Sequence, residues 1–132
     1  MSKIRVLLAD DHEATLDWTR TLLNGEFDVV GTARNGRDAV AEVRRLDPDV
    51  LVIDISMPFL NGLQAASLLG ASCRTKVVFL TLCRENGFVE AAFSVGAAAF
   101  VVKTDLNTDL VPAIREALEG RRYISSSAAP LD

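Results

Sequence analysis

The sequence lacks the features that define several common classes of protein. No apolar run approaches the ~20 residues of a membrane-spanning helix, and Asp10 and Asp11 come too early for a secretory signal peptide. Cysteine is scarce: Cys73 and Cys83 form no CxxC pair, so we expect neither a disulfide framework nor a zinc site. Two free thiols favour a reducing compartment, and we therefore expect a cytoplasmic protein with no membrane contact.

An excess of basic residues is also absent. The formal net charge is −4, and the basic residues are scattered along the chain. We therefore do not expect this chain by itself to bind nucleic acid or an acidic membrane surface. The glycine-rich phosphate motifs GxGxxG and GxxxxGK(S/T) are missing as well. Their absence argues against a dinucleotide-binding module and against a P-loop enzyme.

Short apolar runs alternate with helical patterns along the 132 residues. The strand-like runs are residues 4–9, 28–33, 50–53, 77–81 and 99–102. Helices are predicted at residues 13–23, 35–46, 62–70, 86–95 and 110–118. The runs are rich in β-branched residues and mostly do not alternate with polar ones, as in strands that are covered on both faces. Five such strand–helix units predict a parallel sheet with helices on both faces.

Several residues mark the ends of the predicted helices. Asn35, with Asp38 three residues later, indicates the start of the second helix, which must end before Pro48. Gly120 closes the last helix. Pro112 falls in the first turns of that helix and is expected to cost it a hydrogen bond.

Polar residues suited to a shared chemistry stand at the ends of four of the five predicted strands, and only at the second, near Arg34 and Asn35, do we predict no site. In chain order they are Asp10 and Asp11, Asp54, Thr81, and Lys103. Ligands of open parallel sheets bind at the carboxyl ends of the strands, so we expect these side chains to meet there. Crowded carboxylates repel one another and favour a hard divalent cation, for which Mg²⁺ is the expected candidate. Lys103 and Thr81 suit phosphoryl oxygens, and Asp54, alone on the middle strand, is the expected nucleophile for an aspartyl phosphate.

Each of these residues also has an ordinary interpretation. An aspartate at a strand end often caps a helix, and Asp11 could do so for the next one. Lys103 could be solvated, and Thr81 could be a satisfied strand end. His12, the single histidine, is assigned a structural or solvated role. The occurrence of the whole set at one edge of the sheet is what favours a phosphoryl site.

Four motifs give the chain a resemblance to a known family. LLADDH, LVIDISMPFLNG, VVFLT and AAFVVKTD resemble, in order and spacing, the motifs of receiver domains of two-component response regulators. The stretch EALEGRRYISSS resembles the end of receivers from NarL/LuxR-type transcription regulators. The resemblance implies a flavodoxin-like, doubly wound (βα)5 fold with a five-stranded parallel sheet of order 2-1-3-4-5. It implies a receiver domain over residues 1–122, with residues 123–132 as a tail or the start of a linker to an effector domain absent from this chain.

The resemblance also assigns a phosphoryl acceptor and a metal site. Asp54 would be the phosphoacceptor. Asp11 would bind Mg²⁺ together with Asp54 and the backbone carbonyl of Ser56, and Asp10 would assist. Met57–Pro58 and Gly62 would shape the loop beside the acceptor.

Further residues would pair with the phosphoryl group or respond to it. Lys103 would pair with the phosphoryl group, Thr81 would move to hydrogen-bond it, and Phe100 would be the switch aromatic residue. Leu82 stands where the family usually has a small residue, and its bulk could hinder access to the acceptor or the movement of Thr81. Cys83, like Ser56, occupies a position that tunes the phosphoryl lifetime in similar proteins.

The implied function is that of a signalling switch and not of a conventional enzyme. The domain would accept a phosphoryl group from a sensor histidine kinase and assist its own phosphorylation and dephosphorylation. The surface of the fourth helix, fifth strand and fifth helix would change, with homodimerisation or an attached domain as the output, and DNA would be contacted only through that absent domain. One alternative is a pseudo-receiver that acts only as an interaction module, for which Leu82 is the argument. Another is an aspartyl phosphatase, which commonly needs a second acid where Ser56 stands.

Overall fold

Strands and helices alternate through the whole of the chain that this computed structural model describes, which is residues 3–70, 73–82 and 86–125. The strands are β1 (Ile4–Ala9), β2 (Phe27–Ala33), β3 (Val50–Asp54), β4 (Lys76–Thr81), β5 (Ala99–Val102) and β6 (Tyr123–Ile124). The helices are α1 (Glu13–Leu23), α2 (Gly36–Leu46), α3 (Gly62–Leu69), α4 (Asn86–Ser94) and α5 (Leu106–Leu118), with a short 3-10 turn at Lys103–Asp105.

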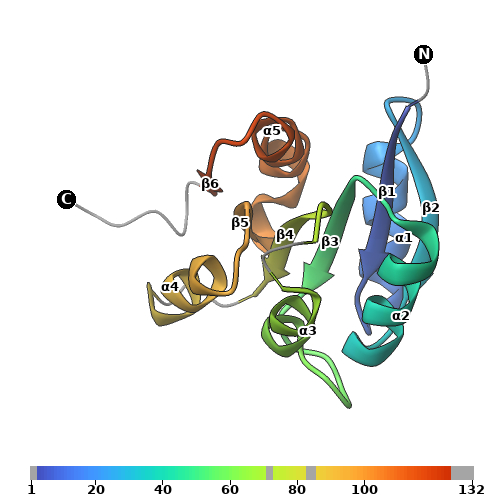
Figure 1. The fold of residues 1–132 in the computed structure, drawn as a ribbon. Helices are drawn as coiled ribbons and strands as arrows, with labels where there is room; N and C mark the ends of the chain where they lie inside the picture. The colour runs from blue at the N-terminus through green and yellow to red at the C-terminus, as the bar shows by residue number, and fades with distance from the viewer. Residues whose placement is uncertain (1–2, 71–72, 83–85, 126–132) are drawn as a thin grey trace.

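The strands form one parallel sheet in the order β2-β1-β3-β4-β5-β6 (Figure 1). The order of the first five strands confirms the flavodoxin-like prediction. The sixth strand was not predicted, since Tyr123–Ile124 had been assigned to the tail. It pairs with β5 at Ala99 and Phe100, so the sheet has six strands in the described residues where we expected five. The boundary at residue 122 between domain and tail stays a prediction.

The sheet is covered on both faces, which explains its nearly continuous apolar strands. Successive residues of a strand point to opposite faces, so the core divides into two layers. Leu7, Leu51 and Phe79 pack with helices α2, α3 and α4. Val6 and Val50, one residue away, pack with α1 and α5 on the other face, and Figure 1 shows the same two groups of helices.

Local capping fixes two of the helices as their sequences suggest. The side chain of Asn35 accepts a hydrogen bond of 2.8 Å from the Asp38 backbone N–H, which confirms the predicted start of α2. Asn61 and Gln64 form a reciprocal capping box at α3. A cap such as Asn35 or Asn61 typically stabilises a helix by about 1 kcal/mol.

The last helix, α5, begins four residues before the predicted start and continues through Pro112.

The sheet order reverses direction between β1 and β3. The chain runs from β1 outward to β2 and then returns to the other side of β1 to form β3. At such a reversal the connections leave in opposite directions and open a crevice at the carboxyl ends of the strands. The fold therefore places a natural binding position next to Asp10, Asp11 and Asp54. None of the helices in the described part of the chain is both long and apolar enough to cross a bilayer.

Candidate functional site

Strand register brings the predicted site residues to one edge of the sheet. Ala9 pairs with Ile53, so the next residues, Asp10 and Asp54, end neighbouring strands side by side. Thr81 pairs with Val102, so Lys103 follows at the same edge. These positions follow from parallel pairing alone and need no special local conformation.

Lys103 joins the two buried carboxylates. Its ammonium lies 2.8 Å from Asp10 Oδ2 and 3.2 Å from Asp54 Oδ2. Asp10 and Asp54 are 2% and 3% exposed, and the lysine side chain is 10% exposed. Ion pairs at this depth are poorly screened by water, so each charge depends strongly on the others. The predicted meeting of Asp10, Asp54 and Lys103 is therefore observed.

Burial and crowding alter the acid–base behaviour of this group. Desolvation raises the pKa of Asp54 above its usual value, and the charge of Asp10 adds to the effect, while Lys103 opposes it. For Lys103, burial acts to lower the pKa, but the contact of its ammonium with the Asp10 carboxylate and the charge of Asp54 outweigh burial and raise the pKa. Lys103 is thus held as a cation beside a carboxylate that is costly to ionise. Additional positive charge would favour the ionised carboxylate.

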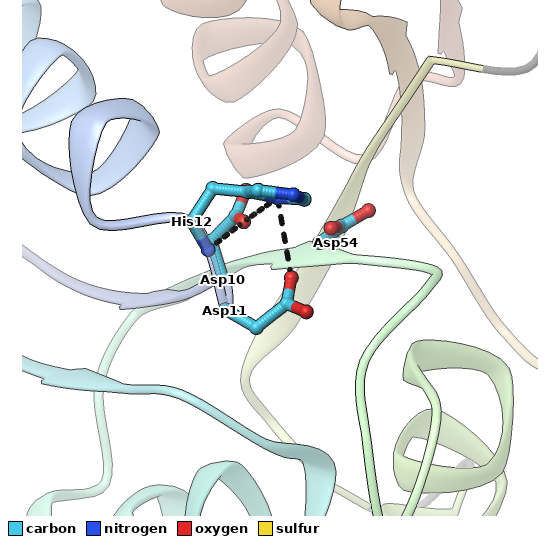
Figure 2. A group of neighbouring side chains, drawn as sticks. All are labelled: Asp10, Asp11, His12 and Asp54. Carbon is cyan, nitrogen blue, oxygen red and sulfur yellow. Dashed lines mark hydrogen bonds and ion pairs between the residues drawn. The ribbon is translucent and has the colours of Figure 1, made fainter.

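Asp11 and His12 complete the cluster on the outer side of Asp10. The His12 Nδ1 atom lies 3.2 Å from an oxygen of Asp10 and 3.2 Å from an oxygen of Asp11. The backbone N–H of His12 also donates to Asp10 Oδ1 at 2.9 Å. In Figure 2 dashed lines join the imidazole to the carboxylates of Asp10 and Asp11, and Asp54 lies alongside.

The donor set of this cluster fits a divalent cation. One ligand atom from each of Asp10, Asp11, His12 and Asp54 lies within 4.8 Å of the others. Asp10 Oδ2 is fully buried and accepts no well-aligned hydrogen bond from the described residues, although the Lys103 ammonium is 2.8 Å away as an ion pair. Carboxylate oxygens of this kind are the ligands that Mg²⁺ prefers. The residues present therefore suit the metal that the sequence predicted.

The loop after β3 is pinned close to the end of that strand. The Gly62 N–H donates to the Ile55 carbonyl at 2.8 Å, and a Cβ atom at Gly62 would lie 2.3 Å from the Asp54 carbonyl oxygen. Only glycine fits such an approach. The Ser56 N–H also donates to Asp54 Oδ1 at 3.3 Å. An open hollow of about 490 Å³ beside the loop is lined in part by Asp11 and Ser56. The metal-binding role of the Ser56 carbonyl stays a prediction.

The predicted switch residues occupy the adjacent strands. Thr81 ends β4 and is 4% exposed, and Phe100 lies completely buried in β5. Leu82, whose bulk was expected to affect the site, is 69% exposed. Its side chain is therefore not fixed in a packed position, and its effect on access stays a prediction. Cys83 falls outside the described residues.

The contact of His12 with the site carboxylates was not predicted. We expected a structural or solvated residue, and the imidazole is 61% exposed, but it also lies 3.2 Å from both Asp10 and Asp11. Its place directly after the acidic pair was the available signal. The alternative that Asp11 caps the next helix is wrong, because the N-cap residue of α1 is His12.

Comparison with known proteins agrees with this geometry. The profile of the response regulator receiver domain family matches residues 6–115. The chain is 39% identical over 129 residues to the response regulator GacA of Pseudomonas aeruginosa, covering 96% of this chain and 60% of GacA. It is 37% identical over 129 residues to the response regulator UvrY of Escherichia coli, covering 96% of this chain and 59% of UvrY. The chain thus spans about six tenths of the length of these curated relatives.

Solved structures show the same architecture. The signal receiver domain of NarL from Mycobacterium tuberculosis superposes with a TM-score of 0.86 at 31% identity, covering 92% of this chain and all of that domain. A LuxR-family two-component response regulator from Aurantimonas superposes with a TM-score of 0.90 at 28% identity, covering 96% of this chain and 93% of that structure.

Proposed function

Since the chain belongs to the response regulator receiver domain family, we propose that it takes a phosphoryl group on Asp54. The observation that carries the proposal is the placement of this buried carboxylate at the end of the middle strand, with the Lys103 ammonium 3.2 Å away. A buried ammonium there has a phosphoryl oxygen as a natural partner once Asp54 is modified.

The chemistry is an in-line displacement at phosphorus. A carboxylate oxygen of Asp54 forms the new bond to phosphorus, and the bond from phosphorus to the donor's nitrogen or oxygen breaks, with its electron pair leaving on the donor. Lys103 neutralises charge that spreads over the phosphoryl oxygens. Mg²⁺, held by Asp11, Asp54 and the Ser56 carbonyl with help from Asp10, would supply further positive charge for the same purpose.

The response to phosphorylation involves Thr81 and Phe100. In this proposal Thr81 moves to hydrogen-bond the phosphoryl group, and the Phe100 ring turns into the space that Thr81 has left. The Phe100 ring is already in the core of this structure, so the proposed exchange is between this position and a less buried one. Such a change is a population shift that alters the surface of α4, β5 and α5.

The partners follow from the same proposal. The phosphodonor is a sensor histidine kinase in the cytoplasm, and the output is control of transcription, through homodimerisation or through a DNA-binding region beyond this chain. The similarity to the response regulators GacA and UvrY, and the length of those relatives beyond the matched region, support this part.

Acetyl phosphate provides the direct test. Incubation of the chain with Mg²⁺ and acetyl phosphate should add one phosphoryl mass to the wild type and none to Asp54→Asn. Asp28→Asn, which changes an exposed aspartate on β2, is the matched control and should be labelled like the wild type. Labelling of Asp54→Asn at the wild-type level would show that the acceptor is another residue. A wild type that binds Mg²⁺ but accepts no phosphoryl group would instead support the pseudo-receiver alternative.

A further inference from the structure

The His12 side chain lies against the carboxylates of Asp10 and Asp11, which are proposed to bind the metal, and does not cap the helix that begins after it. As the N-cap residue of α1 it could turn toward the helix, yet its side chain makes no capping hydrogen bond to the described residues. The backbone N–H bond to Asp10 Oδ1 fixes the start of the side chain. The ring then lies over Asp10 and Asp11, as Figure 2 shows.

The contacts of the His12 ring are long ones, and the hydrogen bond between Nδ1 and Asp10 Oδ1 lies at the upper end of the usual distance range. Both Nδ1–oxygen distances are 3.2 Å, whereas charge-assisted N–H···O bonds are typically about 2.7–2.9 Å. Neither carboxylate therefore holds the ring in a short hydrogen bond. The imidazole is also 61% exposed, so it can adjust without disturbing the core.

Distances within the cluster allow Nδ1 to share an ion with the oxygens. Two ligands of one Mg²⁺ can be at most about 4.2 Å apart, which is twice its bond length. The four ligand atoms, His12 nitrogen included, already lie within 4.8 Å of one another. An adjustment of well under 1 Å, which the exposed His12 and half-exposed Asp11 side chains can make, would bring them within reach of a single ion.

We propose that His12 determines the metal preference of this site by supplying a nitrogen ligand beside the carboxylates. The inference rests on the proposed Mg²⁺-dependent function. Oxygen ligands suit Mg²⁺, whereas imidazole nitrogen strengthens the binding of transition ions such as Co²⁺, Ni²⁺ and Zn²⁺. The site therefore favours such ions over Mg²⁺ more than its carboxylates alone would.

Spectroscopy of the bound ion tests nitrogen ligation directly. The chain has one histidine, so in the untagged protein any imidazole signal belongs to His12. Pulsed electron paramagnetic resonance of bound Mn²⁺ should show coupling to ¹⁴N, which changes to the ¹⁵N pattern after labelling with ¹⁵N-histidine. The coupling should disappear in His12→Ser, where serine is a good N-cap residue and maintains the helix.

Calorimetric titration tests the preference. The ratio of Co²⁺ affinity to Mg²⁺ affinity should fall about tenfold or more in His12→Ser, because loss of the imidazole weakens the binding of Co²⁺ much more than that of Mg²⁺, which prefers oxygen ligands. Glu13→Gln, which removes the neighbouring exposed charge, is the control and should leave the ratio unchanged.

The outcomes separate this inference from the proposed function. Mg²⁺ binding with no nitrogen coupling and an unchanged ratio would refute the role of His12 and leave the phosphoacceptor proposal intact. Equal weakening of both metals in His12→Ser would also refute it, because the imidazole would then act only on overall affinity. A wild type that binds neither ion would overturn both proposals.

Discussion

Replacing Lys103 by methionine tests how strongly the acidic site depends on its buried ammonium. The contacts of 2.8 Å and 3.2 Å to Asp10 and Asp54 correspond to attractions of roughly 6 and 5 kcal/mol at an effective dielectric constant of about 20. Burying the three charges cancels most of this attraction in the wild type. Methionine has a similar length and no charge, so two buried carboxylates lose their counter-charge. We expect unfolding to become easier by about 3–5 kcal/mol at neutral pH, the usual cost of breaking a buried pair.

Urea unfolding without divalent metal, followed by circular dichroism, measures this loss. Lys76→Met, which removes an exposed lysine on β4, should change stability by no more than about 0.5 kcal/mol. Asp10→Asn, added to Lys103→Met, should recover part of the loss because it removes one of the uncompensated charges. A Lys103→Met loss below about 1 kcal/mol, or an Asp10→Asn change that simply adds to it, would refute the view that these charges depend on one another.

Two further predictions concern residues outside the ammonium–carboxylate contacts. The pKa of Asp49 is lowered, first by the hydrogen bond from the Arg5 backbone N–H, so its charge stabilises the fold above about pH 4 and less as the pH falls through its folded pKa. Asp49→Asn should therefore cost about 1 kcal/mol at pH 7, and acid titration of unfolding should show the difference shrinking; a constant difference would contradict this. Gly62→Ala would place a Cβ 2.3 Å from the Asp54 carbonyl oxygen and should cost at least about 3 kcal/mol, whereas Gly70→Ala, at φ 76° in open space, should cost about 1–2 kcal/mol in the same urea assay. Equal costs would show that the loop simply moves aside.

Much of the fold was predictable because the strands are buried on both faces. Apolar runs such as residues 50–53 have few alternatives to a central strand. The start of α2 was predictable because asparagine, with an acidic residue three positions later, is a common capping pattern. Strand β6 was missed because Tyr123–Ile124 is too short to show a period and follows two arginines. Its pairing depends on the edge of β5 being within reach, which is a property of the assembled sheet.

The site was predictable to the extent that the backbone determines it. Parallel register alone carries Asp10, Asp54 and Lys103 to one edge, so their meeting could be predicted from strand ends. The direction of a half-exposed side chain depends on rotamers and local hydrogen bonds, which no spacing rule supplies. For this reason the sequence did not predict the contact of His12 with the carboxylates. It also could not exclude Asp11 as a helix cap, which the structure does.

The ammonium that joins the carboxylates belongs to Lys103, directly after the fifth strand, whereas its partners Asp10 and Asp54 lie at the ends of the first and third strands. During synthesis Asp10 and Asp54 leave the ribosome well before Lys103, and they gain the opposite charge of its ammonium only after β5 has packed onto the sheet. Such long-range closure is slow compared with helix formation. If Asp54 is the phosphoacceptor as proposed, a nascent or partly folded chain would therefore lack the assembled site, and phosphorylation would become possible only when β5 has joined the sheet.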